Sequence, residues 1–183
     1  IVDINVDNQF GIEDQVSPVV FLQPTTATLC NTEMIAFAEQ YLTHKHWANF
    51  QKLAEALLQH MPYISASTTV THTAMESFSA RQGVCQDHSH VLIAMAKALG
   101  VPARYVSSYL YVNNQSHLAS HAWTEIFLDG KWHVIDVSNQ LFRPESHVYV
   151  AIGRDYWDVA PVRGVREQGG TETMYSIVQV LAC

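Results

Sequence analysis

The sequence predicts an α+β fold in which helices come first along the chain and a mainly antiparallel β-sheet follows. Apolar residues recur at helical spacing between residues 32 and 60 and again between residues 85 and 99. Beyond Pro102, polar and apolar residues alternate, and most of the remaining chain has the pattern of strands. Because helices and strands are segregated along the chain, we expect an α+β domain.

The composition limits the classes of function. With 183 residues, 48% of them hydrophobic and 15% charged, the chain has the size and balance of one globular domain. Its net charge of -7 comes without a basic cluster, which excludes nucleic acid as a partner. No apolar run reaches membrane-spanning length, and the N-terminus lacks the order of a secretory signal, so we expect no membrane partner.

The cysteines favour a reducing compartment. Cys30, Cys85 and Cys183 do not make a disulfide framework, and their odd number leaves at least one free thiol. We therefore expect a cytoplasmic protein. Because the chain starts at Ile1 rather than Met, the sequence leaves open whether a further domain precedes it.

The first 24 residues have the pattern of a strand-like lead-in. A weak alternation of Val2, Ile4 and Val6 is followed by an apolar run at residues 19–22. This stretch is too short for an independent domain. Residues 25–183 are expected to form the main domain.

Three helical regions are expected next. Residues 32–60 form either two core helices or one broken helix, with Thr32 as the N-cap. Thr73 caps a short helix over residues 74–80. The third region starts at Cys85 and ends at Gly100-Val101-Pro102, where a Gly stop is followed by Pro.

Cys85 stands at the first turn of the third helix. Unpaired backbone N–H groups and the positive end of the helix dipole favour a thiolate at this place, as a nucleophilic cysteine requires. The carboxylate of Asp87, two residues away, opposes the thiolate, so a partner cation is needed. The alternative is that Cys85 is a small residue that fills a helix start.

A hairpin supplies the partner. Asp129-Gly130 separates two β-rich runs and is the strongest short hairpin signal available. With a two-residue loop, Leu128 lies opposite Lys131, and His121 becomes a diagonal neighbour of Asp136 on one face, within reach of its carboxylate. The residues predicted to share that face are His121, Trp123, Trp132, Val134 and Asp136. The alternative is a core histidine with a satisfied hydrogen bond and an acid that merely ends a strand.

Taken together, Cys85, His121 and Asp136 supply a nucleophile, a base and an orienting acid. At these residues the chain resembles the transglutaminase-like superfamily, a group with a papain-type fold, and its bacterial branch of transglutaminase-like enzymes and candidate cysteine proteases. The resemblance covers residues from about Phe21 to Val180. It rests on Gly83-Val84-Cys85-Gln86-Asp87 with His90, Gly100-Val101-Pro102-Ala103-Arg104-Tyr105-Val106, His121-Ala122-Trp123, Trp132 before Asp136, and the run from Gly153 to Gly164.

The resemblance implies a papain-type core, with Cys85 as nucleophile, His121 as general base and acid, and Asp136 as orienting acid. The chain departs from the branch at Ser89, where a small apolar residue is usual, and at Val137-Ser138, where Pro-Thr or Pro-Ala is usual. Members of the branch usually also carry a β-domain before the catalytic part. Residues 1–24 would be at most its remnant.

The remaining site residues are less constrained. The Cys85 backbone N–H is one candidate oxyanion donor, and Tyr63 ranks before Gln82 and Trp47 as the second. Ordinary packing is the alternative for these three side chains. Residues 153–171 lack strand or helix patterns, so we expect a loop that borders the cleft.

The expected function is acyl transfer from a peptide or protein amide through a thioester, and the sequence leaves hydrolysis and transamidation open. No cofactor or metal is expected, because His88 and His90 are about 200° apart around a helix and no metal-binding spacing occurs. The alternative class is a catalytically silent interaction module on the same fold.

Overall fold

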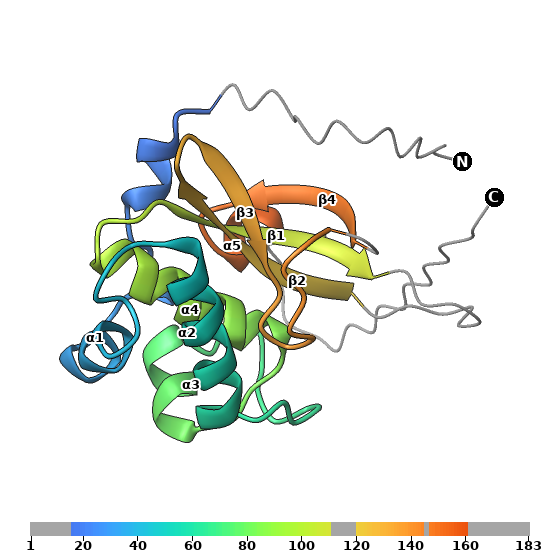
Figure 1. Cartoon of the computed structure of the whole chain (residues 1–183). Coiled ribbons are helices and arrows are strands. Elements are labelled where there is room, and N and C mark those ends of the chain that lie inside the picture. The colour runs from blue at the N-terminus through green and yellow to red at the C-terminus, as the bar shows by residue number, and fades with distance from the viewer. Residues whose placement is uncertain (1–15, 111–119, 145–146, 161–183) are drawn as a thin grey trace.

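The computed structural model describes residues 16–110, 120–144 and 147–160 of the 183-residue chain. The α+β prediction is confirmed, because two short 3-10 helices and four α-helices precede the strands within these ranges (Figure 1). The elements are η1 (Pro18–Leu22), η2 (Thr26–Thr28), α1 (Thr32–Glu39), α2 (Trp47–His60), α3 (Ala74–Ala80), α4 (Cys85–Ala98), β1 (Ala103–Leu110), β2 (Ser120–Leu128), β3 (Lys131–Ile135), β4 (His147–Gly153) and α5 (Tyr156–Val159).

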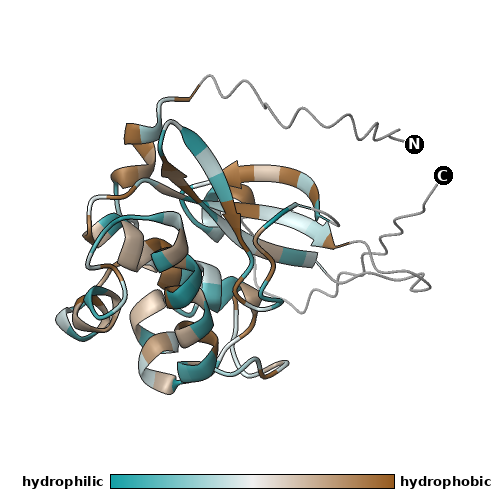
Figure 2. Ribbon diagram, viewed as in Figure 1, coloured by the Kyte–Doolittle hydropathy of each residue, from teal (hydrophilic) through white to brown (hydrophobic). Residues whose placement is uncertain are grey.

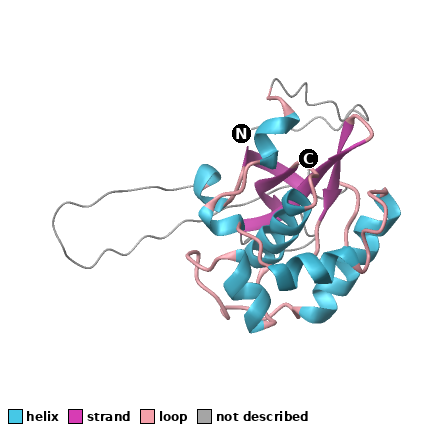
Figure 3. Ribbon diagram, turned by 90° about the vertical axis from the view of Figure 1, so that its left-hand side faces the viewer, coloured by secondary structure: helices cyan, strands magenta, loops and turns pink. Residues whose placement is uncertain are grey.

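The four strands form one sheet in the order β3-β2-β1-β4, and every neighbouring pair is antiparallel. In the turned view, the longer helices lie together on one side of the strands (Figure 3). Bands of hydrophobic and hydrophilic residues alternate along the strands in Figure 2, as expected for a sheet whose two faces have different environments. Ala122, Ile126 and Leu128 of β2 belong to the same core cluster as α4.

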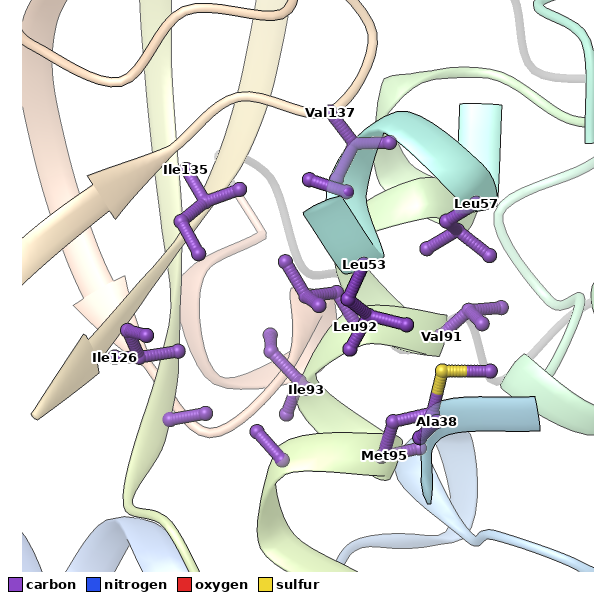
Figure 4. Close-up of a cluster of buried hydrophobic side chains, with 14 of the residues drawn as sticks. Ala38, Leu53, Leu57, Val91, Leu92, Ile93, Met95, Ile126, Ile135 and Val137 are labelled. Atoms are coloured by element: carbon purple, nitrogen blue, oxygen red, sulfur yellow. The ribbon is translucent and has the colours of Figure 1, made fainter. Parts of the chain in front are cut away.

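Helix α4 is the centre of the core. It lies between the sheet and helices α1 and α2, with Ile126 and Ile135 on its sheet side and Leu53 and Leu57 on the other (Figure 4). Its residues from Asp87 to Lys97 are all buried. A helix covered on every side holds its first residue in a fixed position relative to the strands, and that first residue is Cys85.

The end of α4 confirms the predicted Gly stop. Gly100 has φ +73°, a conformation that L side chains rarely adopt. Its N–H donates to the carbonyl of Lys97 at 2.9 Å, and the N–H of Val101 donates to that of Ala96 at 2.8 Å. This pair of bonds is a Schellman motif, which satisfies the last carbonyls of the helix and turns the chain into β1.

The strand prediction for residues 19–22 is wrong, because Pro18–Leu22 forms the 3-10 helix η1. Pro18 stands in its first turn, where the ring fixes φ near a helical value and the missing N–H costs nothing. Phe21 packs edge-on against Trp132 at 5.4 Å, so side-chain packing holds the segment rather than a strand ladder. Val2, Ile4 and Val6 lie outside the described residues.

The helical region at residues 32–60 consists of two helices, α1 and α2. The N-cap of α1 is Asn31 rather than Thr32, and its side chain accepts the Met34 N–H at 2.9 Å. Thr73 caps α3 as predicted. It forms a capping box with Glu76, whose carboxylate accepts the Thr73 N–H at 2.8 Å.

The loop expected over residues 153–171 is partly structured. Gly153 ends β4, and α5 follows at Tyr156–Val159, capped by the Asp155 carboxylate through the N–H groups of Trp157 and Asp158. The carbonyl of Arg154 accepts a bond from Lys97 Nζ at 3.2 Å. Lys97 follows Cys85 by twelve residues of helix, about 18 Å. The Tyr156 N–H donates to Nε2 of His90, nearer the start of the helix, at 3.1 Å. Residues 154–156 therefore lie along α4 between its middle and its end, and the expected border with the cleft stays a prediction. Residues 161–171 lie outside the described residues.

Candidate active site

The turn before Cys85 is built around the carboxylate of Asp87. This buried group accepts the Val84 N–H at 2.8 Å, the Ser77 hydroxyl at 2.7 Å and the Thr68 hydroxyl at 2.6 Å. A Cβ on Gly83 would lie 2.6 Å from the Cβ of Asp87, so only glycine fits there. The bonds spread the charge of Asp87 over three donors. Its expected opposition to a Cys85 thiolate is reduced accordingly.

The predicted hairpin is confirmed. Asp129 and Gly130 both have positive φ, 52° and 80°, as a type I′ turn requires. Leu128 pairs with Lys131, as the two-residue loop predicts, and the ladder continues to Thr124 and Ile135. Trp123 and Val134 then share one cluster on one face of the sheet.

Regular pairing stops at Ile135, one residue before the acid. Asp136 turns away and forms an isolated bridge with Leu141, with backbone bonds of 2.9 and 3.1 Å. Continued past Ile135, the two-residue-loop register would set Asp136 opposite Trp123 and Ser138 opposite His121, but the ladder does not extend that far. Even so, Nε2 of His121 and Oδ2 of Asp136 are 2.6 Å apart, so the predicted contact between these two side chains is present.

His121 stands between Cys85 and Asp136. Burial lowers the pKa of His121, but hydrogen bonds with Asp136 and Cys85 outweigh burial and raise it to about 9. Because Nε2 is bonded to Asp136, Nδ1 is the nitrogen left for the Cys85 thiol. At neutral pH the ring is thus held as an imidazolium between two groups that carry or can carry negative charge.

Asp136 has more partners than the sequence indicates. Its Oδ2 lies 2.9 Å from Nδ2 of Asn139 and 3.3 Å from Nε2 of His147, in addition to His121. The Asn139 N–H donates to its Oδ1 at 3.2 Å. Burial raises the pKa of Asp136, but hydrogen bonds from His121, His147 and Asn139 hold it well below its ordinary range.

Sequence reasoning missed both Asn139 and His147. A local signal exists for Asn139, since Asp and Asn side chains commonly bond to backbone groups a few residues away in turns. No local signal exists for His147, which lies on β4 at the opposite edge of the sheet from β3. Only the folded sheet brings its ring to Asp136.

The structure separates the three candidate second oxyanion donors. Tyr63 forms a parallel bridge with Gly83, and burial followed by the charge of Cys85 raises the pKa of its hydroxyl, so this side chain is near the thiol. Trp47 instead stacks on His133 at 4.7 Å and packs edge-on against Phe142. Gln82 is half-buried and precedes Cys85 by three residues. Of the three side chains, Tyr63 is the one whose described contacts place it beside Cys85, as an oxyanion donor requires.

Both serines that depart from the resembled branch have polar partners behind the site. The Ser89 hydroxyl donates to the Cys85 carbonyl at 2.8 Å. Ser138 Oγ lies 3.1 Å from Nδ1 of His88, whose Nε2 donates to the carbonyl of Met61 at 2.6 Å. His88 therefore ties the segment after Asp136 to helix α4 and to the end of α2.

Within the described ranges, one group of side chains has the composition of a metal site, namely His121, Asp136 and His147, with candidate ligand atoms within 4.8 Å of one another. Tetrahedral Zn²⁺ with bonds of 2.0–2.1 Å would hold neighbouring ligand atoms about 3.3 Å apart. The 2.6 Å between His121 and Asp136 fits a hydrogen bond and is too short for a shared ion. As packed, the group is a hydrogen-bond network. His88 and His90 also have separate partners, since Nε2 of His90 accepts the Tyr156 N–H at 3.1 Å.

Comparison with known proteins identifies related sequences and folds. The model of the transglutaminase-like superfamily matches residues 35–137. An uncharacterised protein of Mycobacterium leprae is 30% identical over 166 residues, which cover 87% of this chain and 59% of that protein. An uncharacterised protein of Mycobacterium tuberculosis is 34% identical over 125 residues, which cover 62% of this chain and 40% of that protein.

A solved structure with a similar fold supports the sequence matches. The crystal structure of a candidate cysteine protease from Cytophaga hutchinsonii has a TM-score of 0.68 and 28% sequence identity, and the match covers 78% of this chain and 48% of that one. The chain thus spans about half the length of the relatives that it matches. In the part of the chain that the structure describes, no helix is long and apolar enough to cross a membrane.

Proposed function

Because this chain belongs to the transglutaminase-like superfamily, we propose that it catalyses acyl transfer from a peptide or protein amide, with Cys85, His121 and Asp136 as a catalytic triad. The observation that carries the proposal is the position of His121, bonded through Nε2 to Asp136 at 2.6 Å and with Cys85 as its other hydrogen-bonding neighbour. The likeness to a candidate cysteine protease supports the same chemistry.

The first half-reaction consumes the amide. The Cys85 thiolate attacks the amide carbon, an S–C bond forms, and the carbonyl oxygen becomes an oxyanion. The first N–H groups of α4 have no acceptor within the helix, so the Cys85 N–H can donate to this oxyanion, with the Tyr63 hydroxyl as the second donor. The C–N bond then breaks as the imidazolium of His121 gives its proton to the leaving amine. A thioester on Cys85 remains.

The second half-reaction releases the acyl group. Neutral His121 accepts a proton from water or from an amine as that molecule attacks the thioester carbon, and the S–C bond breaks. Water gives a carboxylic acid, as in a peptidase or amidase, whereas an amine gives a new amide, as in a transamidase. Both outcomes use the same triad and differ only in the acceptor that reaches the thioester.

Trapping the thioester tests the proposal. The protein is incubated with a peptide library, quenched in acid and digested, and the Cys85 peptide is searched by mass spectrometry for an added acyl fragment. The identity of that fragment also reports the substrate. Cys85→Ala should abolish the adduct and keep the helix start, because Ala suits a helix. Cys30→Ala is the matched control and should leave the adduct unchanged.

A parent protein that forms no adduct, and that no thiol-reactive acyl probe labels, would favour the silent interaction module. The proposal includes a reducing location such as the cytoplasm, since Cys30 and Cys85 are both unpaired thiols in the described residues and the triad needs Cys85 reduced. Cell fractionation checks that location.

A further inference from the structure

We propose that His147 is a positioning residue of the same site, which holds the carboxylate of Asp136 toward His121. This inference rests on the proposed function and adds a fourth side chain to it. His147 is the first residue of β4, and its side chain is fully buried. Its Nε2 lies 3.3 Å from Oδ2 of Asp136, the oxygen that also bonds His121.

The ring of His147 is fixed on its other side by packing. It meets the ring of Trp123 edge-on, with centroids 4.3 Å apart and an interplanar angle of 87°. Trp123 is fully buried and follows His121 by two residues on β2, so it belongs to the same strand as the proposed base. His147 therefore contacts both Trp123, on the strand that carries His121, and the carboxylate of Asp136.

A buried carboxylate needs such support. Asp136 has no exposed surface, and an ionised group without donors in that position would become protonated or turn away. Asn139 holds it from the turn that follows β3, and His147 holds it from the strand at the far edge of the sheet. With donors on two sides, the carboxylate keeps both its charge and its direction, which the orienting acid of a triad needs.

The competing explanation is that His147 only fills space beside Trp123. Two substitutions of similar volume separate the explanations. His147→Gln keeps an N–H near the position of Nε2, whereas His147→Met has similar length and no donor. His133→Met is the matched control, because His133 also lies on the sheet and stacks on an aromatic ring, that of Trp47, away from Asp136.

The first readout is steady-state kinetics on the peptide found by thioester trapping. His147→Met should lower kcat by roughly 10- to 100-fold, the usual range for loss of one hydrogen bond to a charged group, and should leave KM nearly unchanged. His147→Gln should restore most of kcat. Thermal unfolding of both variants is measured in parallel. Equal kcat in the Gln and Met variants, at any level, would overturn the proposal.

The second readout needs neither a substitution nor activity. In protein labelled with ¹⁵N-histidine, NMR should show His147 protonated at Nε2, and it should show the Nε2 proton of His121 far downfield in its short bond to Asp136. Nδ1 of His147 is buried and has no hydrogen-bond partner among the described residues, so Nε2 is the nitrogen that can donate. A resting protein with His147 protonated only at Nδ1 would refute the role of His147. A parent that forms no thioester but shows both Nε2 protons would refute the acyl-transfer function alone.

Discussion

Nε2 of His121 lies 2.6 Å from Oδ2 of Asp136, with the acid fully buried and the base 11% exposed. The two residues are fifteen positions apart, and the hairpin that joins them has a two-residue loop at Asp129 and Gly130. A short charge-assisted bond of this kind holds the ring as an imidazolium and fixes its orientation. The pH dependence and the reactivity of the site should follow from it.

Replacement of Asp136 by Asn tests that bond directly. The amide keeps the shape of the side chain but loses the charge that favours the imidazolium, so the thiolate fraction at neutral pH should fall. Activity on any acyl substrate should drop by about 10² or more, as in triads of similar logic. The measurement is the alkylation rate of Cys85 against pH in the parent and the variant. Identical thiolate titrations would make Asp136 a purely structural residue.

The two described thiols should differ sharply in reactivity. Burial raises the pKa of Cys30 to about 11, so its thiol stays protonated at neutral pH. Cys85 stands at the start of α4 beside an imidazolium. We expect limited iodoacetamide treatment at mildly acidic pH to label Cys85 first, as read by peptide mapping. Faster labelling of Cys30 or Cys183 would contradict the proposed nucleophile.

The stability of the protein should depend on the titration of His121. Its pKa is about 9 in the folded protein, above the ordinary histidine value of about 6.5. The folded protein therefore binds this proton more tightly than the unfolded chain does. The resulting stabilisation is fully present below about pH 6.5 and is lost as the pH rises through 9. Urea unfolding between pH 6 and 10 should show this loss in the parent. Asp136→Asn should flatten the curve, and a parent curve of equal stability at pH 6.5 and 9.5 would contradict the raised pKa.

Gly83 should tolerate no side chain. In Gly83→Ala the new Cβ would lie 2.6 Å from the Cβ of Asp87, which three hydrogen bonds hold in place. We expect a loss of about 1–3 kcal/mol in the free energy of unfolding and slower alkylation of Cys85, because the turn before it must shift. Urea unfolding and alkylation kinetics measure both effects.

Gly130→Ala is the comparison. It meets no atom within 4 Å but forces a side chain into φ +80°. It should cost about 1 kcal/mol and leave the reactivity of Cys85 nearly unchanged. Equal effects of the two substitutions on alkylation would show that the turn at Gly83 does not position the thiol.

Local chemistry in the sequence determined much of the proposed triad. Gly100 at φ +73° ends α4, and Asp129 with Gly130 at positive φ sets the register between β2 and β3. Both signals depend on backbone conformations that few residue types adopt, so they can be read from neighbouring residues alone. Once the register is set, side-chain alternation brings His121 toward Asp136.

The tertiary structure decided what surrounds that pair. His147 reaches Asp136 only because β4 returns to β1 at the far side of the sheet. Asp87 meets Ser77 only because α3 packs beside α4, and it meets Thr68 only because the loop before α3 folds back onto the start of α4. Residues 18–22 form a 3-10 helix where the apolar run at residues 19–22 predicted a strand piece, and Phe21 packs on Trp132. These contacts join segments far apart in the chain. Their energy comes from burial and hydrogen bonding after the elements have assembled, and no local pattern encodes which elements will meet.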